Sequence, residues 1–246
     1  MAMNRTNVSV PANDPSLKTR TVEFDAKQGK VTAYVAEPAT NDRKPAIIVV
    51  HENRGLNDHI RDVARRVAKA GYVAIAPDLM SPMGGTAAAM QKGEIPEQIR
   101  TITPETHMEN MLATLEYVKS LPTVRTDRIG CTGFCFGGGI TFRFATVAGK
   151  ELTAAVPYYG IAPPLEDVHK INAHVHAMYA ENDARINASL PPLEQAMKEH
   201  HKSFEYQTFA GAGHAFNNDG GANYNAEAAE EAWKAAIKFF DRHLKN

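Results

Sequence analysis

The strongest constraint on the fold is a pair of short apolar runs separated by a helical pattern. Residues 46–50 (AIIVV) and 72–76 (YVAIA) are continuous apolar runs of strand length, as expected for strands buried on both faces of a sheet. Between them, apolar residues recur at helical spacing from Ile60 to Val67, and Gly71 ends the pattern. A strand, a helix and a second strand in this order predict a parallel pair.

The same alternation continues along the chain. Two strands at 21–25 and 31–37 flank a turn at Gln28-Gly29, and further strands are predicted at 128–133, 154–158, 175–180 and 204–209. A last helix is expected to bury Trp233, Ile237, Phe240 and Leu244. The sequence therefore predicts an α/β fold of the α/β-hydrolase type, with a mostly parallel central sheet flanked by helices on both faces.

The expected organisation is a mobile N-terminal arm at 1–20 followed by a single domain at 21–246. One long interruption, 80–104, is rich in Met, Gly, Ala and Pro. We expect it to cap a pocket at the carboxyl edge of the sheet.

Composition excludes several classes of partner. The 27 Lys and Arg residues are balanced by 28 Asp and Glu residues, for a formal charge of −1, so we expect neither nucleic acid nor a membrane as a partner. A small-molecule substrate is favoured, and both a monomer and a homodimer stay open. The two cysteines, Cys131 and Cys135, form no disulfide framework, which predicts a cytoplasmic protein, or a periplasmic one if a leader has been removed.

The segment that carries most chemistry is GFCFGG at 133–138, between a predicted strand and a predicted helix. It fits the G-x-nucleophile-x-G pattern, in which flanking glycines allow a strained turn that exposes the central side chain. At a helix N-terminus the thiolate of Cys135 is favoured, and the N–H of Phe136 can point at a developing oxyanion. The pattern also fits a glycine-rich junction with a buried, inert cysteine.

An acid and a histidine follow in the order typical of α/β-hydrolases. Asp183 comes directly after the strand at 175–180, and His214 follows the strand at 204–209, so both are expected at the carboxyl edge of the sheet. Taken singly, Asp183 also fits a helix cap before Ala188, and His214 a surface loop histidine. Together with Cys135 they favour catalysis.

These motifs resemble the dienelactone hydrolase (carboxymethylenebutenolidase) family of α/β-hydrolases over about residues 20–245. The resemblance is carried by HENRGL at 51–56, PDL at 77–79, GFCFGG at 133–138, Asp183 and GHAF at 213–216. It implies a Cys135-His214-Asp183 triad that opens esters or lactones through a thioester acyl-enzyme. It also implies that Glu52 lies near the resting thiol and that the N–H groups of Phe136 and Asn53 form the oxyanion hole.

Glu52 beside a thiolate would oppose its formation by like-charge repulsion, and its alternative role is an ion pair with Arg54. Two arginines that similar proteins use to hold a substrate carboxylate are not matched after Asp78 or after His214. Arg54, Lys92, Arg100 or Arg185 are the candidate substitutes, each also interpretable as a surface charge. We expect a substrate site lined by Arg54, Tyr159, Met83 and Phe216 that favours an uncharged or bulkier ester over dienelactone itself.

Other patterns carry less chemistry. HExxH is broken by Gly55, and the pair His174 and His176 lacks further ligands, so neither a metal nor another cofactor is predicted. Cys131 reads as a small core residue. The alternative function is a hydrolase fold without turnover, acting as a binding or regulatory protein. The complete triad argues against it.

Overall fold

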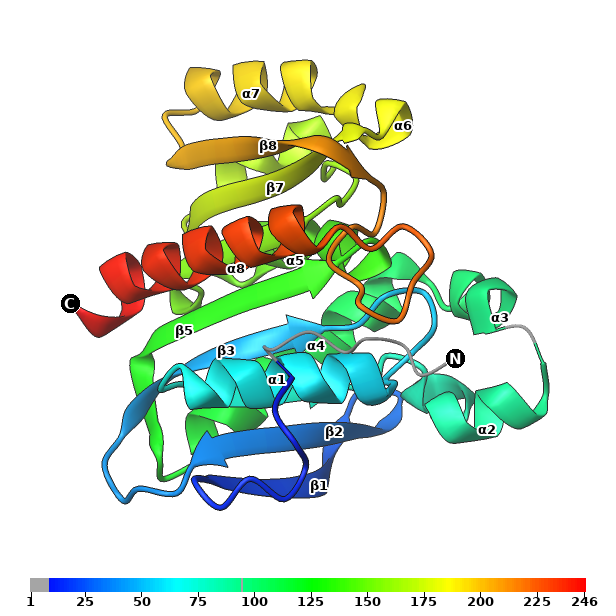
Figure 1. Cartoon of the computed structure of the whole chain (residues 1–246), viewed down its shortest axis with the longest axis vertical. Coiled ribbons are helices and arrows are strands. Elements are labelled where there is room, and N and C mark those ends of the chain that lie inside the picture. The colour runs from blue at the N-terminus through cyan, green and yellow to red at the C-terminus, as the bar shows by residue number, and fades with distance from the viewer. Residues whose placement is uncertain (1–8, 94) are drawn as a thin grey trace. The chain divides into compact units, whose positions relative to one another are not determined.

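The computed structural model describes residues 9–93 and 95–246, which form two compact units, Val10–Ile129 and Gly130–Asn246. Figure 1 shows the strands and helices of each unit. In the first unit the strand order is β1-β2-β4-β3, with β1/β2 and β2/β4 antiparallel and β3/β4 parallel. The predicted parallel pair at 46–50 and 72–76 is confirmed. The strands are β1 (Leu17–Ala26), β2 (Gly29–Pro38), β3 (Lys44–Val50) and β4 (Val73–Pro77).

Two long helices cover the strands of the first unit. In Figure 1, α1 lies in front of them and α4 behind. Asn57 caps the first helix by accepting a hydrogen bond from the N–H of Ile60 (3.1 Å), and Thr103 caps the second by accepting from Thr106 (3.2 Å). The helices are α1 (Asp58–Lys69) and α4 (Pro104–Ser120).

The interruption at 80–104 has secondary structure of its own. It contains a 3₁₀ turn followed by two short helices, and Thr86 at the start of the first is buried and donates its hydroxyl to Asp78 (2.7 Å). The elements are η1 (Ser81–Met83), α2 (Thr86–Gln91) and α3 (Ile95–Thr101). Three alanines in α2 favour a helix where the sequence suggested a long loop.

The predicted mobile arm at 1–20 includes residues that the structure places in a strand or attaches to a helix. Strand β1 begins at Leu17, four residues before the expected start, and the described residues ahead of it are attached to α1. The N–H of Val10 donates to Asp62 (2.8 Å), and Lys69 pairs with Asp14 (2.8 Å). These contacts are non-local, so the local composition of the segment gives no sign of them. The part of the arm before residue 9 lies outside the described residues.

The second unit holds a run of parallel strands. Strand β5 begins in the first unit and ends in the second, where β5, β6, β7 and β8 pair in parallel in that order. The strands are β5 (Val124–Phe134), β6 (Ala154–Tyr158), β7 (His174–Asn182) and β8 (Phe204–Gly213). The helical elements are α5 (Phe136–Val147), η2 (Gly149–Glu151), η3 (Leu165–Lys170), α6 (Ala184–Asn187), α7 (Leu190–Glu199), α8 (Ala226–Phe240) and η4 (Asp241–Lys245).

Glycines in β5 show that helices cover both faces of the strands in this unit. A Cβ atom on Gly130 would lie 2.8 Å from the ring of Phe240 in α8, whereas a Cβ on Gly133 would lie 2.2 Å from the carbonyl oxygen of Gly137 in α5. Positions 130 and 133 face opposite sides, because side chains alternate along a strand. The expected α/β fold with mostly parallel strands and helices on both faces is confirmed.

The buried face of α8 is one position away from the prediction. Ala232, Ala236, Phe239 and Phe240 are buried, while Trp233 and Ile237 are only half-buried. Phe240 and Leu244 are buried as expected. The prediction followed Trp233 and Ile237 because they are large and apolar. The helix instead packs closely against the sheet through its alanines, which a prediction based on apolar character alone does not select as core residues.

Two buried histidines of the first unit are held neutral. His51 is fully buried, and its burial lowers its pKa. His107 in α4 is also buried, and its burial lowers its pKa to about 4. Neutral imidazole is therefore the folded form at both positions. Among the described residues, every helix is too short or too weakly apolar to cross a bilayer.

The depressed pKa of His107 predicts a loss of stability in acid. The unfolded chain takes up a proton near the usual histidine pKa, whereas the folded chain does so only near 4, so stability is full above the unfolded value and falls as the pH drops toward 4. Replacing His107 with the non-titrating Gln should remove about 2 kcal/mol of the fall in unfolding free energy between pH 7 and pH 5. Urea denaturation at the two pH values measures it. Parallel pH profiles for the two proteins would contradict the neutral, buried state of His107.

Candidate active site

Cys135 lies on a sharp turn between the end of β5 and the start of α5. Its backbone is left-handed, with φ 55° and ψ −112°, a region that non-glycine residues rarely adopt. Its N–H donates to the carbonyl of Tyr158 in β6 (3.1 Å), and its own carbonyl accepts from Gly139 in α5 (3.1 Å). The turn is thus fastened on both sides, and the side chain remains partly exposed.

The turn depends on glycines that bring backbone against backbone. A Cβ on Gly133 would lie 2.2 Å from the carbonyl oxygen of Gly137. A Cβ on Gly138 would lie 2.4 Å from the carbonyl oxygen of Tyr158 and 2.9 Å from Cα of Gly160. Any larger residue would force α5 away from β5 and β6. The sequence motif supplied the glycines in α5 but gave no indication of Gly160.

His214 and Asp183 meet Cys135 at the carboxyl ends of three parallel strands. Nδ1 of His214 lies 2.5 Å from Oδ2 of Asp183, and Nε2 lies 3.0 Å from Sγ of Cys135. Because the carboxylate only accepts, the Nδ1 nitrogen carries the proton and Nε2 faces the thiol. The geometry is that of a nucleophile, a base and an orienting acid.

Asp183 also has the second role that its sequence context suggested. Its Oδ1 lies 3.4 Å from the N–H of Ile186, a long capping contact at the start of α6. The carboxyl group is buried, with 6% of the residue exposed. One oxygen therefore faces the helix and the other faces the histidine.

Aromatic rings pack around His214 within the second unit. The ring of Tyr159 meets the His214 ring edge-on, with centroids 5.2 Å apart, and Phe216 packs edge-on against Tyr159 at 5.3 Å. Both residues are fully buried. Tyr159 also has a left-handed backbone, with φ 36°. Of the two predicted substrate residues of this unit, Tyr159 therefore contacts the His214 imidazole and Phe216 contacts Tyr159.

Sequence reasoning missed Asn223. Its side-chain Nδ2 donates to the backbone carbonyl of His214 (3.0 Å), and the N–H of Asn225 donates to the carbonyl of Phe216 (3.0 Å). These bonds tie the loop before α8 to the segment that carries the histidine. Nothing in the local sequence marks the contact, because it joins residues nine positions apart through a loop.

Four of the predicted residues belong to the first unit. Glu52 is buried with 4% exposed, Asn53 and Met83 are half-buried, and Arg54 is exposed. Arg54 borders a pocket of about 490 Å³ together with Asn57, Met90, Ile95 and Pro96. The predicted roles of these residues toward Cys135 stay predictions.

His51 fixes the backbone on which Glu52 and Asn53 stand. Its Nε2 accepts a hydrogen bond from the N–H of Leu79 (3.0 Å), so Nδ1 carries the proton of the neutral ring and donates to the carbonyl of Glu52 (2.6 Å). This side chain joins the ends of β3 and β4. The sequence offered it only as half of a broken zinc motif.

Two other predictions concern thiols and metals. Cys131 is fully buried in β5, and burial raises its pKa to about 12, which confirms it as a core residue. His174 contacts Ser203 Oγ (2.8 Å), and the His176 ring packs against Phe239. Within the described residues, no group of three or more His, Cys, Asp or Glu side chains is arranged to hold a metal ion.

Comparison with known proteins agrees with this geometry. The sequence pattern of the dienelactone hydrolase family matches residues 31–244. A Synechocystis sp. protein named "Putative carboxymethylenebutenolidase" is 35% identical over 245 residues, covering 93% of this chain and 98% of its own. A Bradyrhizobium protein named "Probable 2-oxo-3-(5-oxofuran-2-ylidene)propanoate lactonase" is 30% identical over 224 residues, covering 86% and 89%.

A solved structure is similar over almost its whole length. The crystal structure of a "Putative Dienelactone Hydrolase" from Klebsiella pneumoniae has a TM-score of 0.82 and 29% identity, and covers 92% of this chain and 99% of that one. Parallel strands, a sharp turn before α5 and an acid and histidine at later strand ends define an α/β-hydrolase. The chain belongs to the dienelactone hydrolase family, and it is a hydrolase of ester or lactone bonds.

The close backbone approach at the turn makes Gly133 intolerant of a side chain. We expect Gly133→Ala to lose about 3 kcal/mol or more of unfolding free energy, because the new Cβ meets backbone atoms of α5 that have no flexible end to move. Thermal and urea denaturation measure the loss. Gly220→Ala is the matched control, since its Cβ would have an ordinary contact of 3.5 Å. Equal stability of the two variants would contradict the packing at the turn.

Proposed function

We propose that the chain hydrolyses carboxylic esters or lactones with Cys135 as the nucleophile, through a thioester acyl-enzyme. The observation that carries the proposal is the chain of contacts from Asp183 through His214 to the thiol, at 2.5 Å and 3.0 Å. A catalytically silent binding protein would not need this alignment.

In the acylation half of the reaction, Nε2 of His214 takes the thiol proton and Sγ of Cys135 attacks the carbonyl carbon. The tetrahedral intermediate collapses when its C–O bond to the leaving group breaks. The proton on Nε2 passes to the departing oxygen, and a thioester remains on Cys135. Asp183 holds the imidazole in the tautomer that makes this transfer possible.

In the second half, water gives a proton to Nε2 of His214 and its oxygen attacks the thioester carbon. The C–S bond breaks, the proton returns to the sulfur, and the carboxylic acid is released. The N–H of Phe136, at the first position of α5, and that of Asn53 are the proposed oxyanion donors. Such donors contribute several kcal/mol in each step.

Glu52 is proposed to act on the resting thiol. A carboxylate close to Cys135 would disfavour the thiolate by like-charge repulsion until substrate binding relieves that repulsion. Glu52 is buried in the first unit, and this burial supports a specific role because carboxylates without one are rarely buried.

The proposed substrate is an uncharged or bulkier ester or lactone, in preference to dienelactone itself. The segments after Asp78 and after His214 carry no arginine, so a bidentate grip on a carboxylate is missing at those two places. The proposed lining is Arg54, Tyr159, Met83 and Phe216. Cytoplasmic location and a monomeric or homodimeric state remain our expectations, and no nucleic-acid or membrane partner is proposed.

Removal of the nucleophile tests the proposal directly. We expect Cys135→Ala to lower kcat/KM for p-nitrophenyl acetate by about a thousandfold or more, because no other group replaces the attacking sulfur. Cys131→Ala is the control, since that thiol is buried in β5. Iodoacetamide should inactivate the wild type with one equivalent bound at Cys135. Full activity in the Cys135 variant would sink the cysteine mechanism.

The two roles of Asp183 can be separated by two substitutions. Asp183→Asn keeps an oxygen that can cap α6, but it favours the wrong imidazole tautomer, so kcat should fall by about 10²- to 10⁴-fold with little change in melting temperature. Asp183→Ala should lower both. If Asp183→Asn retains the wild-type rate, the carboxyl group is a helix cap and the triad assignment is wrong.

A further inference from the structure

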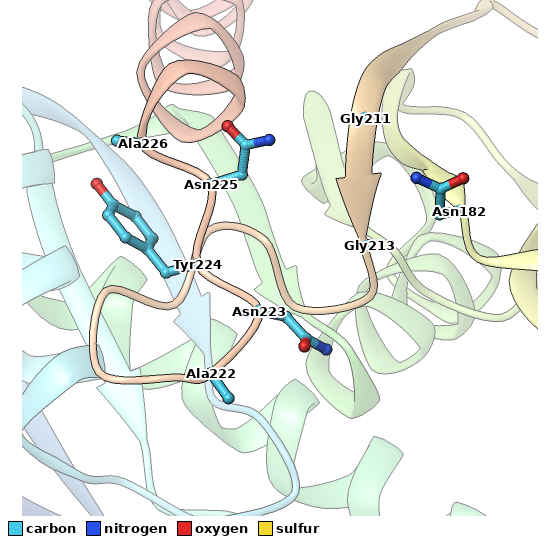
Figure 2. Close-up of a pocket in the computed structure, with 8 residues that line it drawn as sticks. All are labelled: Asn182, Gly211, Gly213, Ala222, Asn223, Tyr224, Asn225 and Ala226. Atoms are coloured by element: carbon cyan, nitrogen blue, oxygen red, sulfur yellow. The ribbon is translucent and has the colours of Figure 1, made fainter.

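An open pocket of about 540 Å³ lies beside the catalytic histidine, within the second unit. Figure 2 shows it between the ends of β7 and β8 and the loop that leads into α8. Its volume is in the range of small-ligand sites. The lining residues are Asn182, Gly211, Gly213, Ala222, Asn223, Tyr224, Asn225 and Ala226.

The lining is polar and carries no charge. Its side-chain polar groups are three carboxamides and one phenol, with no Lys, Arg, Asp, Glu or His among the lining residues. In Figure 2 the amide of Asn223 points from the loop toward β8, Asn182 lies on the other side of that strand, and the ring of Tyr224 points away from both. The carboxylate of Glu181 accepts from the N–H of the lining residue Gly211 (2.8 Å), and the lining residues themselves carry no charge, which favours a neutral ligand.

Two of the amides have their orientation fixed by the backbone. Oδ1 of Asn225 accepts from the N–H of Ala228 (3.1 Å), which leaves its NH₂ group as a donor for the pocket. Nδ2 of Asn223 donates to the carbonyl of His214 (3.0 Å), which leaves its Oδ1 as an acceptor. The pocket therefore presents a fixed donor beside a fixed acceptor.

Asn182 and the glycines complete the array. The Asn182 side chain is exposed and makes no hydrogen bond to another residue in the described part of the chain, so it offers both a donor and an acceptor. Space next to Gly211 and Gly213 is open, with nothing within 4 Å of an added Cβ. Paired donors and acceptors without charge match hydroxyl groups, each of which donates one hydrogen bond and accepts others.

The pocket adjoins the proposed catalytic groups through the chain itself. Asn182 precedes Asp183, Gly213 precedes His214, and Asn223 is bonded to His214. A ligand held here lies against the segment that delivers the proton to the leaving oxygen. We propose that the pocket binds the alcohol part of the ester substrate, and that this part is a neutral group with several hydroxyls, such as a glycosyl or polyol group. This assignment rests on the proposed function and names its substrate class.

A matched pair of esters tests the assignment. Methyl 6-O-acetyl-β-D-glucopyranoside and cyclohexylmethyl acetate share the acyl group and a six-membered ring, but only the first carries hydroxyls. We expect wild type to favour the glucoside in kcat/KM by about tenfold or more, because the hydrogen bonds between its hydroxyls and the amides have no counterpart in the analogue. Asn182→Ala should reduce this preference severalfold, and Ala222→Leu, which fills the pocket and keeps the amides, should do the same.

Asn172→Ala is the control, because it removes an exposed amide of the same unit outside the pocket and should leave the preference unchanged. Equal treatment of the two esters by wild type overturns the proposal. So does a preference that survives both Asn182→Ala and Ala222→Leu.

A binding measurement separates this proposal from the hydrolase mechanism. Side-chain amide signals of Asn182, Asn223 and Asn225 should shift in NMR spectra when methyl β-D-glucopyranoside is added, whether or not any ester is cleaved. Absence of shifts at high millimolar probe overturns the site even if esters are hydrolysed. Shifts without any ester preference overturn the assignment to the substrate.

Discussion

The contact between the backbones of β5, β6 and α5 is the constraint on which the active site depends. Cys135 keeps a left-handed backbone only because its N–H is bonded to Tyr158 and its carbonyl to Gly139. Such a conformation costs about 1–3 kcal/mol and persists where the surroundings fix it. Close packing through glycines supplies that fixation, and the sulfur is presented at the start of a helix as a result.

Parallel pairing then brings Asp183 and His214 to the thiol of Cys135. Strands β5, β7 and β8 end at the same edge, so residues 48 and 79 positions beyond Cys135 reach hydrogen-bonding distance in a relay. Tyr159 and Phe216 hold the imidazole from the side, and Asn223 holds its backbone. Tyr159 follows β6, whereas Phe216 and Asn223 both lie in the segment between β8 and α8, and the His214 side chain remains 27% exposed.

The sequence was informative wherever a local pattern decides the structure. Apolar runs and glycines predicted the strands and the turn at Cys135, and strand ends predicted the places of Asp183 and His214. The attachment of Val10 and Asp14 to α1, the bond from Asn223 and the two bonds of His51 escaped prediction, because non-local contacts leave no periodicity in the sequence. The face of α8 was misjudged because alanines, the small residues of the helix, make its contact with the sheet.

The close contact between Gly138 and Gly160 limits the substitutions that this fold can accept during evolution. Each missing Cβ would meet backbone atoms of the other residue, at 2.9 Å and 2.3 Å. In an ordinary core, a larger side chain at one position is offset by a smaller one at its neighbour. Here the neighbour has no side chain to shrink, so no second substitution can restore the fit. The two positions cannot exchange volume, and a lineage that departs from glycine at either one must rebuild the helix, the strand and the turn at Cys135 together.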